Sequence, residues 1–141
     1  MPLKIIDHGT KEYNQMLDLR NEILRYPLGF KLENSDIDED KDNILIGAFE
    51  EEQLLGCCML VQTKGIVLLR QMAVKNALQG KGIGRAIMNF AENIAHDIGY
   101  NEMNMYARAS TAVFYERLGY TISGDAFTRL TIPHFLMKKK I

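Results

Sequence analysis

The chain has 141 residues, of which 47% are hydrophobic and 25% are charged, and its formal net charge is -1 at pH 7. This balance fits one folded domain with a single apolar core. A net charge so close to zero gives no basic field to hold nucleic acid, and an anionic membrane would attract the chain only weakly. No secretory signal or bilayer-spanning apolar stretch is present, so the expected location is the reducing cytoplasm.

The first third of the chain contains one strand signal and one helix signal. Leu3–Ile6 predicts a short strand. Thr10 can cap a helix that runs to about Tyr26, where a proline and Gly29 would stop it. The acidic run Glu33–Asp42 predicts a surface loop or a short irregular helix.

Three strands are predicted next. Ile44–Phe49 and Leu54–Gln62 are separated by a polar turn, and the near-continuous apolar run Ile66–Val74 is typical of a central strand. Cys57 and Cys58 are adjacent on the second of these strands. Neighbours on a strand point to opposite faces, so no disulfide between them is expected.

The second half of the chain alternates helices and strands. Gly82 begins a helix whose apolar residues recur at the 3.6-residue period, and Gly99 ends it. The remaining elements are a strand, a helix capped by its serine, and two final strands: Glu102–Ala107, Ser110–Leu118, Tyr120–Ser123 and His134–Lys138. This order predicts an α/β sheet whose faces are covered by helices.

A glycine-rich turn, QGKGIGRA at Gln79–Ala86, follows the strongest strand and opens the best amphipathic helix. Its N–H groups can form an anion nest at a helix N-terminus, where a pyrophosphate fits, although a plain tight turn would use the same glycines. The spacing is not the dinucleotide fingerprint. It is not a P-loop either, since Gly84 is followed by Arg85 instead of Lys-Ser/Thr.

Two motifs together resemble the GNAT acetyltransferase superfamily. Gln79–Gly84 is similar to its (Arg/Gln)-x-x-Gly-x-(Gly/Ala) coenzyme A motif, and Phe114–Tyr120, FYERLGY, is similar to its Phe-Tyr helix ending in Leu-Gly-aromatic. The resemblance implies one domain, residues 1–141, with a mixed central sheet of six or seven strands and helices on both faces. One departure is that the family often has an asparagine where this chain has Ser110 or Thr111.

The same resemblance implies acetyl-coenzyme A (acetyl-CoA) as cosubstrate, no metal, and an N-acetyltransferase that pairs as a homodimer. The turn would hold the pyrophosphate, and Met72–Val74 would bind the pantetheine arm through its backbone. Lys81 and Arg85 can assist with phosphate charge or remain solvated. The implied cosubstrate-binding residues are Met72, Ala73, Val74, Gln79, Gly80, Lys81, Gly82, Ile83, Gly84 and Arg85.

Arg70 is an unusual residue in the apolar central strand. By the period-2 rule it would share a face with Leu68, Met72 and Val74. Arginine is rarely buried unless it is paired. Its partner can be an acidic group of the acceptor substrate or an acidic side chain of the chain itself.

Arg25, Arg108 and His134 complete the candidate acceptor site. Considered singly, Arg25 can favour a helix C-terminus, Arg108 can be a surface charge and His134 can be structural. With their neighbours the four residues resemble the glyphosate N-acetyltransferase type of GNAT enzyme: Ile23-Leu24-Arg25, Leu69-Arg70, Ala107-Arg108 and Pro133-His134. In that branch the arginines bind the anionic groups of the substrate and the histidine is the general base.

The expected chemistry is direct transfer of acetyl to an amine. His134 would take the amine proton, since histidine is suited to proton transfer near neutral pH. A backbone N–H of Met72–Val74 would stabilise the oxyanion, and Tyr115 would protonate the departing thiolate unless it is only a core aromatic. Cys57 and Cys58 lack a nearby base, so no acetyl-cysteine intermediate is expected.

Three functions remain open on the sequence. The arginines favour a small amine that carries a carboxylate or phosphonate. The second is acetylation of a protein or peptide N-terminus. The third is a non-catalytic regulatory module that binds coenzyme A, against which His134 and Tyr115 both argue.

Overall fold

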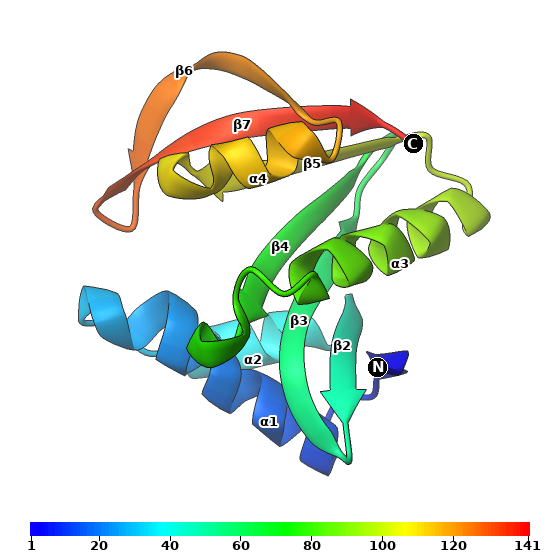
Figure 1. Cartoon of the computed structure of the whole chain (residues 1–141), viewed down its shortest axis with the longest axis vertical. Helices are drawn as coiled ribbons and strands as arrows, with labels where there is room; N and C mark the ends of the chain where they lie inside the picture. Colours follow the sequence, from blue (N-terminus) through cyan, green and yellow to red (C-terminus); the bar gives the residue numbers. More distant parts are fainter.

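Seven strands form one mixed sheet in the order β1-β2-β3-β4-β5-β7-β6 in the computed structural model, which describes residues 1–141 (Figure 1). The strands are β1 Leu3–Ile6, β2 Ile44–Glu50, β3 Gln53–Gln62, β4 Val67–Val74, β5 Glu102–Arg108, β6 Thr121–Arg129 and β7 Ile132–Lys140. Every neighbouring pair is antiparallel except β4 and β5, which run parallel. The expected α/β fold with a mixed sheet is confirmed, and β6 and β7 are longer than predicted.

Helices lie on both faces of the sheet. The α-helices are α1 Lys11–Arg20, α2 Asn34–Asp40, α3 Ile83–Asp97 and α4 Ala112–Arg117. One π-helical turn and three 3-10 turns accompany them: η1 Asn21–Arg25, η2 Tyr26–Leu28, η3 Asn76–Leu78 and η4 Ala109–Thr111. Each α-helix falls within a segment for which the sequence predicted a helix or left one open.

The ends of the first two helices follow from local side chains. The predicted cap is confirmed, since the Thr10 hydroxyl accepts a hydrogen bond from the Tyr13 N–H at 3.2 Å. Beyond α1 the chain continues through η1 and η2 until Gly29, in the left-handed region at φ 80°, ends it. The acidic run forms α2. Reciprocal hydrogen bonds between Glu33 and Asp36 form a capping box at the start of this helix.

The predicted cap of the last helix is wrong. A 3-10 turn precedes α4, so this helix begins at Ala112 and not directly after Ser110. The capping position is Thr111, which makes no capping bond. Its hydroxyl donates instead to the carbonyl of Arg108 at 2.8 Å, which holds the turn against the end of β5.

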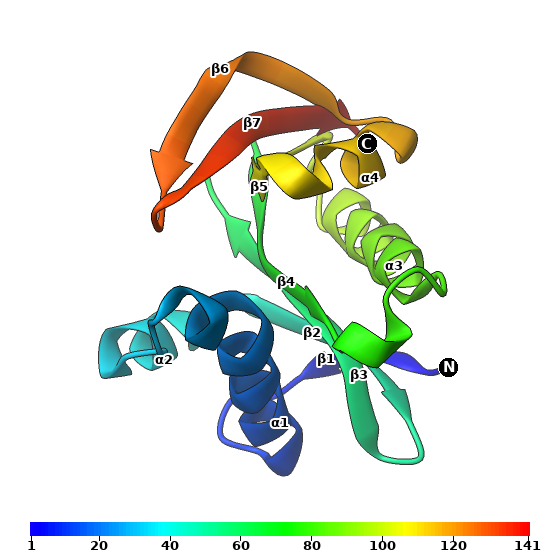
Figure 2. The ribbon, with the colours of Figure 1, turned by 60° about the vertical axis from the view of Figure 1, so that its left-hand side comes forward.

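Two apolar clusters fill the two sides of the sheet. Figure 2 shows α3 on one of these sides and α1 on the other. One contains the buried stripe of α3, formed by Ile83, Ile87, Met88, Ala91 and Ala95. The other contains the buried residues of α1. Cys58 belongs to the first cluster and Cys57 to the second, and both thiols are free, which confirms the expectation for adjacent strand residues.

The sheet opens between its two parallel strands. Pairing of β4 with β5 is limited to Val67–Leu69 against Met103–Met105, after which the strands diverge (Figures 1 and 2). Both continue for several residues beyond this point. One edge of β4 therefore has no strand beside it from residue 70 onward, and a wedge separates it from β5.

A β-bulge interrupts β4 at the start of the wedge. Arg70 is opposite Met59 and Ala73 is opposite Cys57, so two residues of β4 stand against one of β3. Gln71, the first of the two, has φ 57°, which is unusual for a residue other than glycine. Bulges of this kind re-aim the side chains that follow them.

The bulge separates Arg70 from Met72 and Val74, two of the three residues predicted to share its face. Met72 and Val74 pack against the core on the α3 side. Arg70 lies on the other side of the strand, where it contacts α2. Strict alternation would have put the three together, but the extra residue inverts the order, so β4 presents different residues to the two sides of the wedge.

Candidate active site

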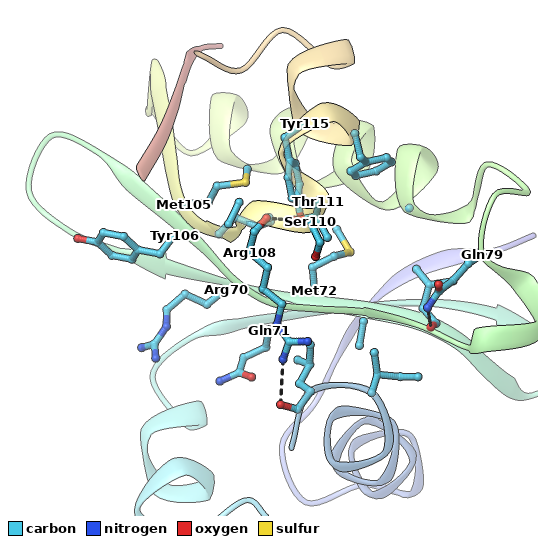
Figure 3. Close-up of a pocket in the computed structure, with 18 of the residues that line it drawn as sticks. Arg70, Gln71, Met72, Gln79, Met105, Tyr106, Arg108, Ser110, Thr111 and Tyr115 are labelled. Carbon is cyan, nitrogen blue, oxygen red and sulfur yellow. Dashed lines mark hydrogen bonds between the residues drawn. The ribbon is translucent and has the colours of Figure 1, made fainter. Parts of the chain in front are cut away.

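A cavity of about 840 Å³ occupies the wedge between β4 and β5 (Figure 3). Most of the predicted site residues line it: Arg25, Arg70, Met72, Ala73, Val74, Gln79, Gly80, Gly82, Gly84, Arg85, Arg108, Tyr115 and His134. Gln79 lies at one end of the view in Figure 3, Arg70 and Tyr106 lie at the other, and Met72 lies between. The fold therefore brings these sequence-distant residues to one site.

Each glycine of the turn before α3 has a structural reason. Gly80 and Gly82 adopt φ 81° and 87°, a region that other residues enter at a cost. Gly84 is needed for space, since a Cβ there would come within 3.1 Å of the Phe114 ring. The turn thus places backbone N–H groups at the positive end of the 15-residue helix α3, which suits an anionic group.

The other residues of the turn divide into different roles. The Gln79 amide donates to the carbonyl of Val74 at 3.1 Å and to the Asn76 side chain at 3.2 Å, so it braces the turn on the end of β4. Lys81 is exposed and outside the cavity lining. The Ile83 side chain is buried in the core, so only the backbone of this predicted binding residue is available to a ligand.

The open edge of β4 is the second ligand-binding feature. Its backbone groups from Arg70 to Val74 have no partner strand on the wedge side, and the same residues line the cavity. An extended ligand that carries amides can bind such an edge in the manner of an added strand. The cavity therefore suits a long molecule with an anionic end and an amide-bearing arm.

His134 is a buried residue of the cavity wall. It lies on β7 opposite Arg108, and it is 5% exposed. Its Nδ1 is 3.0 Å from the carbonyl oxygen of Ile132, which can only accept, so Nδ1 carries the proton. The ring stacks on Phe127 with centroids 6.1 Å apart. Nε2 makes no hydrogen bond within the chain.

Tyr115 is both a core aromatic and a cavity residue. Its ring makes edge contacts with Phe114 and Tyr120 at centroid distances of 4.9 and 6.0 Å. Burial raises the pKa of the Tyr115 hydroxyl well above its usual range. The hydroxyl therefore keeps its proton at neutral pH.

Arg25 and Arg108 converge on one backbone carbonyl. Arg108 donates to the oxygen of Leu24 at 3.0 Å (Figure 3), and Arg25 donates to the same oxygen at 3.4 Å. Arg25 also donates to the side chain of Gln71 at 3.2 Å. The bulge residue thus helps to fix the guanidinium of Arg25 at the cavity.

The positive charges at this end of the cavity oppose one another. Burial lowers the pKa of Arg25, and although the Asp36 carboxylate raises it, the charges of Arg108, Arg20 and Arg70 lower it further. Burial also lowers the pKa of Arg108. These guanidiniums are therefore held close together at a cost that an anion would relieve.

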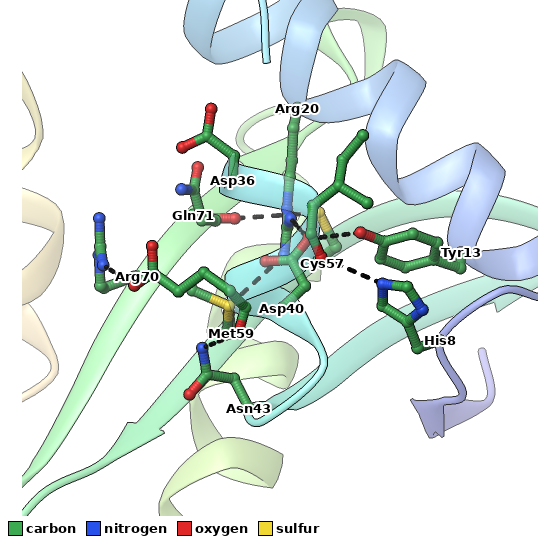
Figure 4. Close-up of polar contacts among 12 residues, drawn as sticks. His8, Tyr13, Arg20, Asp36, Asp40, Asn43, Cys57, Met59, Arg70 and Gln71 are labelled. Carbon is green, nitrogen blue, oxygen red and sulfur yellow. Dashed lines mark hydrogen bonds and ion pairs between the residues drawn. The ribbon is translucent and has the colours of Figure 1, made fainter. Parts of the chain in front are cut away.

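Arg70 is paired within the chain. Its guanidinium donates to the carboxylate of Glu39 on α2 at 3.0 Å (Figure 4). Glu39 is not among the residues that line the cavity, whereas Arg70 is. The sequence left two partners open for Arg70, and the structure shows the acidic side chain of the chain itself. The paired Arg70 still lines the cavity.

Sequence reasoning missed several residues of the cavity. Arg117 lies within the aromatic helix motif and is the one with a local signal. Arg129 lies on the part of β6 that was not predicted, and its guanidinium stands over the ring of Tyr106 at 5.2 Å. With these two, six arginines line the cavity and no aspartate or glutamate does.

Both cysteines are buried, free and outside the cavity lining. Burial raises the pKa of Cys57 to about 11 and that of Cys58 further, so both remain thiols. No three His, Cys, Asp or Glu side chains gather as a metal site. None of the helices is long and apolar enough to cross a membrane.

A sheet opened between two parallel strands, with a glycine turn at one end of the opening and a buried histidine and tyrosine within it, defines an α/β domain with a large cavity between β4 and β5. The chain belongs to the acetyltransferase (GNAT) domain family, which matches residues 41–122, more than half of its length. The Bacillus subtilis protein YyaT is 32% identical over 73 residues, which cover 52% of this chain and 49% of that protein. The chain spans about half the length of the curated relatives that it matches first.

Solved structures share the fold over nearly the whole chain. An acyl-CoA N-acyltransferase from Pseudomonas aeruginosa is 22% identical with a TM-score of 0.83, covering 98% of both chains. An aminoglycoside 6'-N-acetyltransferase complexed with coenzyme A is 18% identical with a TM-score of 0.81, covering 99% of this chain and 97% of that one. At these identities the likeness establishes the common fold.

Proposed function

We propose that the chain is an N-acetyltransferase of one domain, residues 1–141, that transfers acetyl from acetyl-CoA to a small amine carrying a carboxylate or phosphonate. The observation that carries this proposal is the composition of the cavity, where six arginines and no acidic side chain surround His134 and Tyr115. The cavity thus offers cationic partners to two anionic molecules, the cosubstrate and the acceptor.

The cosubstrate end is supported by the turn and the open edge of β4. Backbone N–H groups at Gly80–Gly84 suit the pyrophosphate, and Arg85 and Arg117 supply cationic side chains beside it. Pantetheine is a chain with two amides, and the unpaired edge at Met72–Val74 suits it.

The chemistry follows from two side chains and one backbone segment. His134 Nε2 accepts the proton of the amine while the amine nitrogen bonds to the thioester carbonyl carbon. A backbone N–H in Met72–Val74 stabilises the charge on the carbonyl oxygen. As the carbon–sulfur bond breaks, the hydroxyl of Tyr115 gives its proton to the sulfur, so the products are an amide and a thiol. The proton held by His134 then passes to solvent, and Tyr115 takes one from solvent, which restores both residues.

The acceptor end favours an anion over a polycation. Arg25, Arg70, Arg108 and Arg129 line this part of the cavity without an acidic side chain among the lining residues. An aminoglycoside or polyamine would add positive charge to guanidiniums that already repel one another. The resemblance to the glyphosate N-acetyltransferase type of enzyme points to the same class of acceptor.

A turnover screen tests the proposal directly. Thiol release from acetyl-CoA is measured with amino acids, aminophosphonates, polyamines, aminoglycosides and peptides as acceptors. We expect turnover with an acidic amine. Preference for a polyamine or a peptide amine would overturn the acceptor class, and no turnover with any amine would favour a regulatory module that only binds coenzyme A.

Arg70→Ala tests the role of the arginines. A charge-assisted hydrogen bond contributes about 1.5–3 kcal/mol, so KM for the acidic amine should rise roughly 10- to 100-fold while KM for acetyl-CoA stays constant. Arg70→Lys should recover only part of the loss, because an ammonium cannot make the two parallel bonds of a guanidinium. A variant that loses thermal stability but keeps its KM would show that Arg70 serves Glu39 alone.

We also propose a cytoplasmic homodimer. The exposed strand β6 forms one edge of the sheet, and such edges are usually covered. Light scattering at micromolar concentration measures the mass in solution, and a monomer would remove the dimer from the proposal.

A further inference from the structure

An ion pair joins helix α2 to the wall of the cavity. Glu39 on α2 accepts a hydrogen bond from Arg70 on β4 at 3.0 Å, and the two side chains are 51% and 28% exposed. Arg70 lines the cavity, and Glu39, which contacts Arg70, is not one of the lining residues. The carboxylate therefore occupies one side of a guanidinium that faces the acceptor end.

The neighbouring residue of α2 has the opposite character. Asp40 is 3% exposed and accepts hydrogen bonds from Arg20 at 2.7 Å and from the Tyr13 hydroxyl at 2.6 Å (Figure 4). This buried network fastens the last turn of α2 to α1. Because the backbone there is fixed, Glu39 can leave Arg70 by rotation of its own side chain, without movement of the helix.

We propose that Glu39 is an internal competitor of the acceptor, whose carboxylate is the counterion of Arg70 in the free enzyme and is replaced by the acidic group of the acceptor. This inference rests on the proposed anionic acceptor. Glu39 supplies a single hydrogen bond to a partly exposed guanidinium, a weak contact in water. A carboxylate or phosphonate in the cavity can make two parallel bonds to the guanidinium and so displace Glu39.

Only an anion can take the place of Glu39 at Arg70. An acidic amine supplies Arg70 with a new partner as Glu39 departs, so the guanidinium is never left without a counterion. A neutral or cationic amine offers no replacement, and the Arg70–Glu39 pair stays in place. Glu39 thus lowers the affinity for every anion by a small factor while it keeps the free cavity from accumulating unpaired positive charge.

The experiment uses methylphosphonate, which has an acidic group and no amine to acetylate. Its dissociation constant is measured by phosphorus NMR titration with the enzyme saturated with coenzyme A, so that the phosphate-binding turn is already filled. Glu39→Gln removes the competing charge and nearly keeps the shape. Removal of an exposed ion pair should tighten methylphosphonate binding by roughly 1.5- to 5-fold.

Two controls separate competition at Arg70 from the general field of α2. Asp38→Asn removes a charge from the same helix, at an exposed residue that pairs with Lys41 at 3.3 Å, and it should leave the affinity unchanged. In an Arg70→Ala background, Glu39→Gln should have no further effect, since the contact it competes for is gone.

Three results would overturn the inference. Equal or weaker methylphosphonate binding by Glu39→Gln shows that the carboxylate does not compete. An equal gain in the Arg70→Ala background, or from Asp38→Asn, shows a field effect instead of a specific pair. If wild type and Glu39→Gln both fail to bind methylphosphonate, the anionic acceptor site itself is wrong, and the inference falls with it.

Discussion

Replacement of His134 by alanine tests the central step of the proposed reaction. The imidazole is 5% exposed, and the hydrogen bond from Nδ1 to Ile132 leaves Nε2 as the atom that can take a proton. Alanine removes this atom and leaves the glycine turn and the β4 edge in place. Binding of acetyl-CoA should therefore stay within a factor of two.

The expected loss of rate is larger than the expected loss of stability. Removal of a general base lowers kcat by roughly 10²–10⁴-fold, which corresponds to about 2.7–5.4 kcal/mol of barrier. The fold loses one neutral hydrogen bond, about 0.5–1.5 kcal/mol, and the stacking on Phe127. A domain of this size shifts its midpoint by several degrees for such a change, so the variant should remain folded during the assay.

Thiol release from acetyl-CoA is followed with the best acceptor of the screen, for wild type, His134→Ala and His96→Ala. His96 is exposed on α3, so its replacement controls for removal of a histidine. The acid limb of kcat/KM that a histidine base produces should be absent from His134→Ala and present in the other two. A kcat for His134→Ala within a factor of two of wild type, or an unchanged acid limb, would refute the assignment.

Three further substitutions test other parts of the molecule. Gly82→Asp forces a side chain into the left-handed region and puts a negative charge in the turn, so acetyl-CoA affinity measured by calorimetry should fall at least about 10-fold, and unchanged affinity would exclude the turn from the site. Tyr115→Phe should slow turnover under conditions where departure of the thiol limits the rate. Because burial raises the pKa of Tyr115, the wild-type hydroxyl stays protonated to at least about pH 10. Equal rates for both proteins across the pH profile would exclude its role as an acid. Asp40→Asn leaves Arg20 without its buried counterion, so denaturant unfolding should show a loss of about 3–5 kcal/mol, and a loss below about 1 kcal/mol would contradict the buried network.

The features that the sequence predicted correctly depend on residues near one another in the chain. The helix α3 follows from its apolar period and from the glycines at its two ends. The glycine turn follows from the spacing of Gly80, Gly82 and Gly84, although the reason for the last one, its contact with Phe114, needs the packing of two helices. Strand and helix order were predictable because alternation and capping act locally.

The features that were missed depend on contacts between distant segments. The bulge at Gln71 is a property of the register between β3 and β4, and no residue of β4 predicts it by itself. The pair between Arg70 and Glu39 requires α2 to lie against the sheet, and the Arg20–Asp40 pair that fixes α2 joins residues 20 apart. Arg129 escaped notice because β6 is almost wholly exposed and carries no hydrophobic period.

The two binding roles proposed for β4 depend on its bulge at Gln71. In a regular strand Met72 and Val74 would share the face of Arg70, opposite Val67 and Leu69, which are buried in the core on the side of α3. One extra residue at Gln71 leaves Arg70 on the side of α2 and turns Met72 and Val74, which follow it, to the side of α3. The divergence from β5 then opens the edge of the same residues to a ligand. A single strand can thus hold the acyl carrier by its backbone and the acceptor by its arginine, which places amine and thioester on either side of one short stretch of chain.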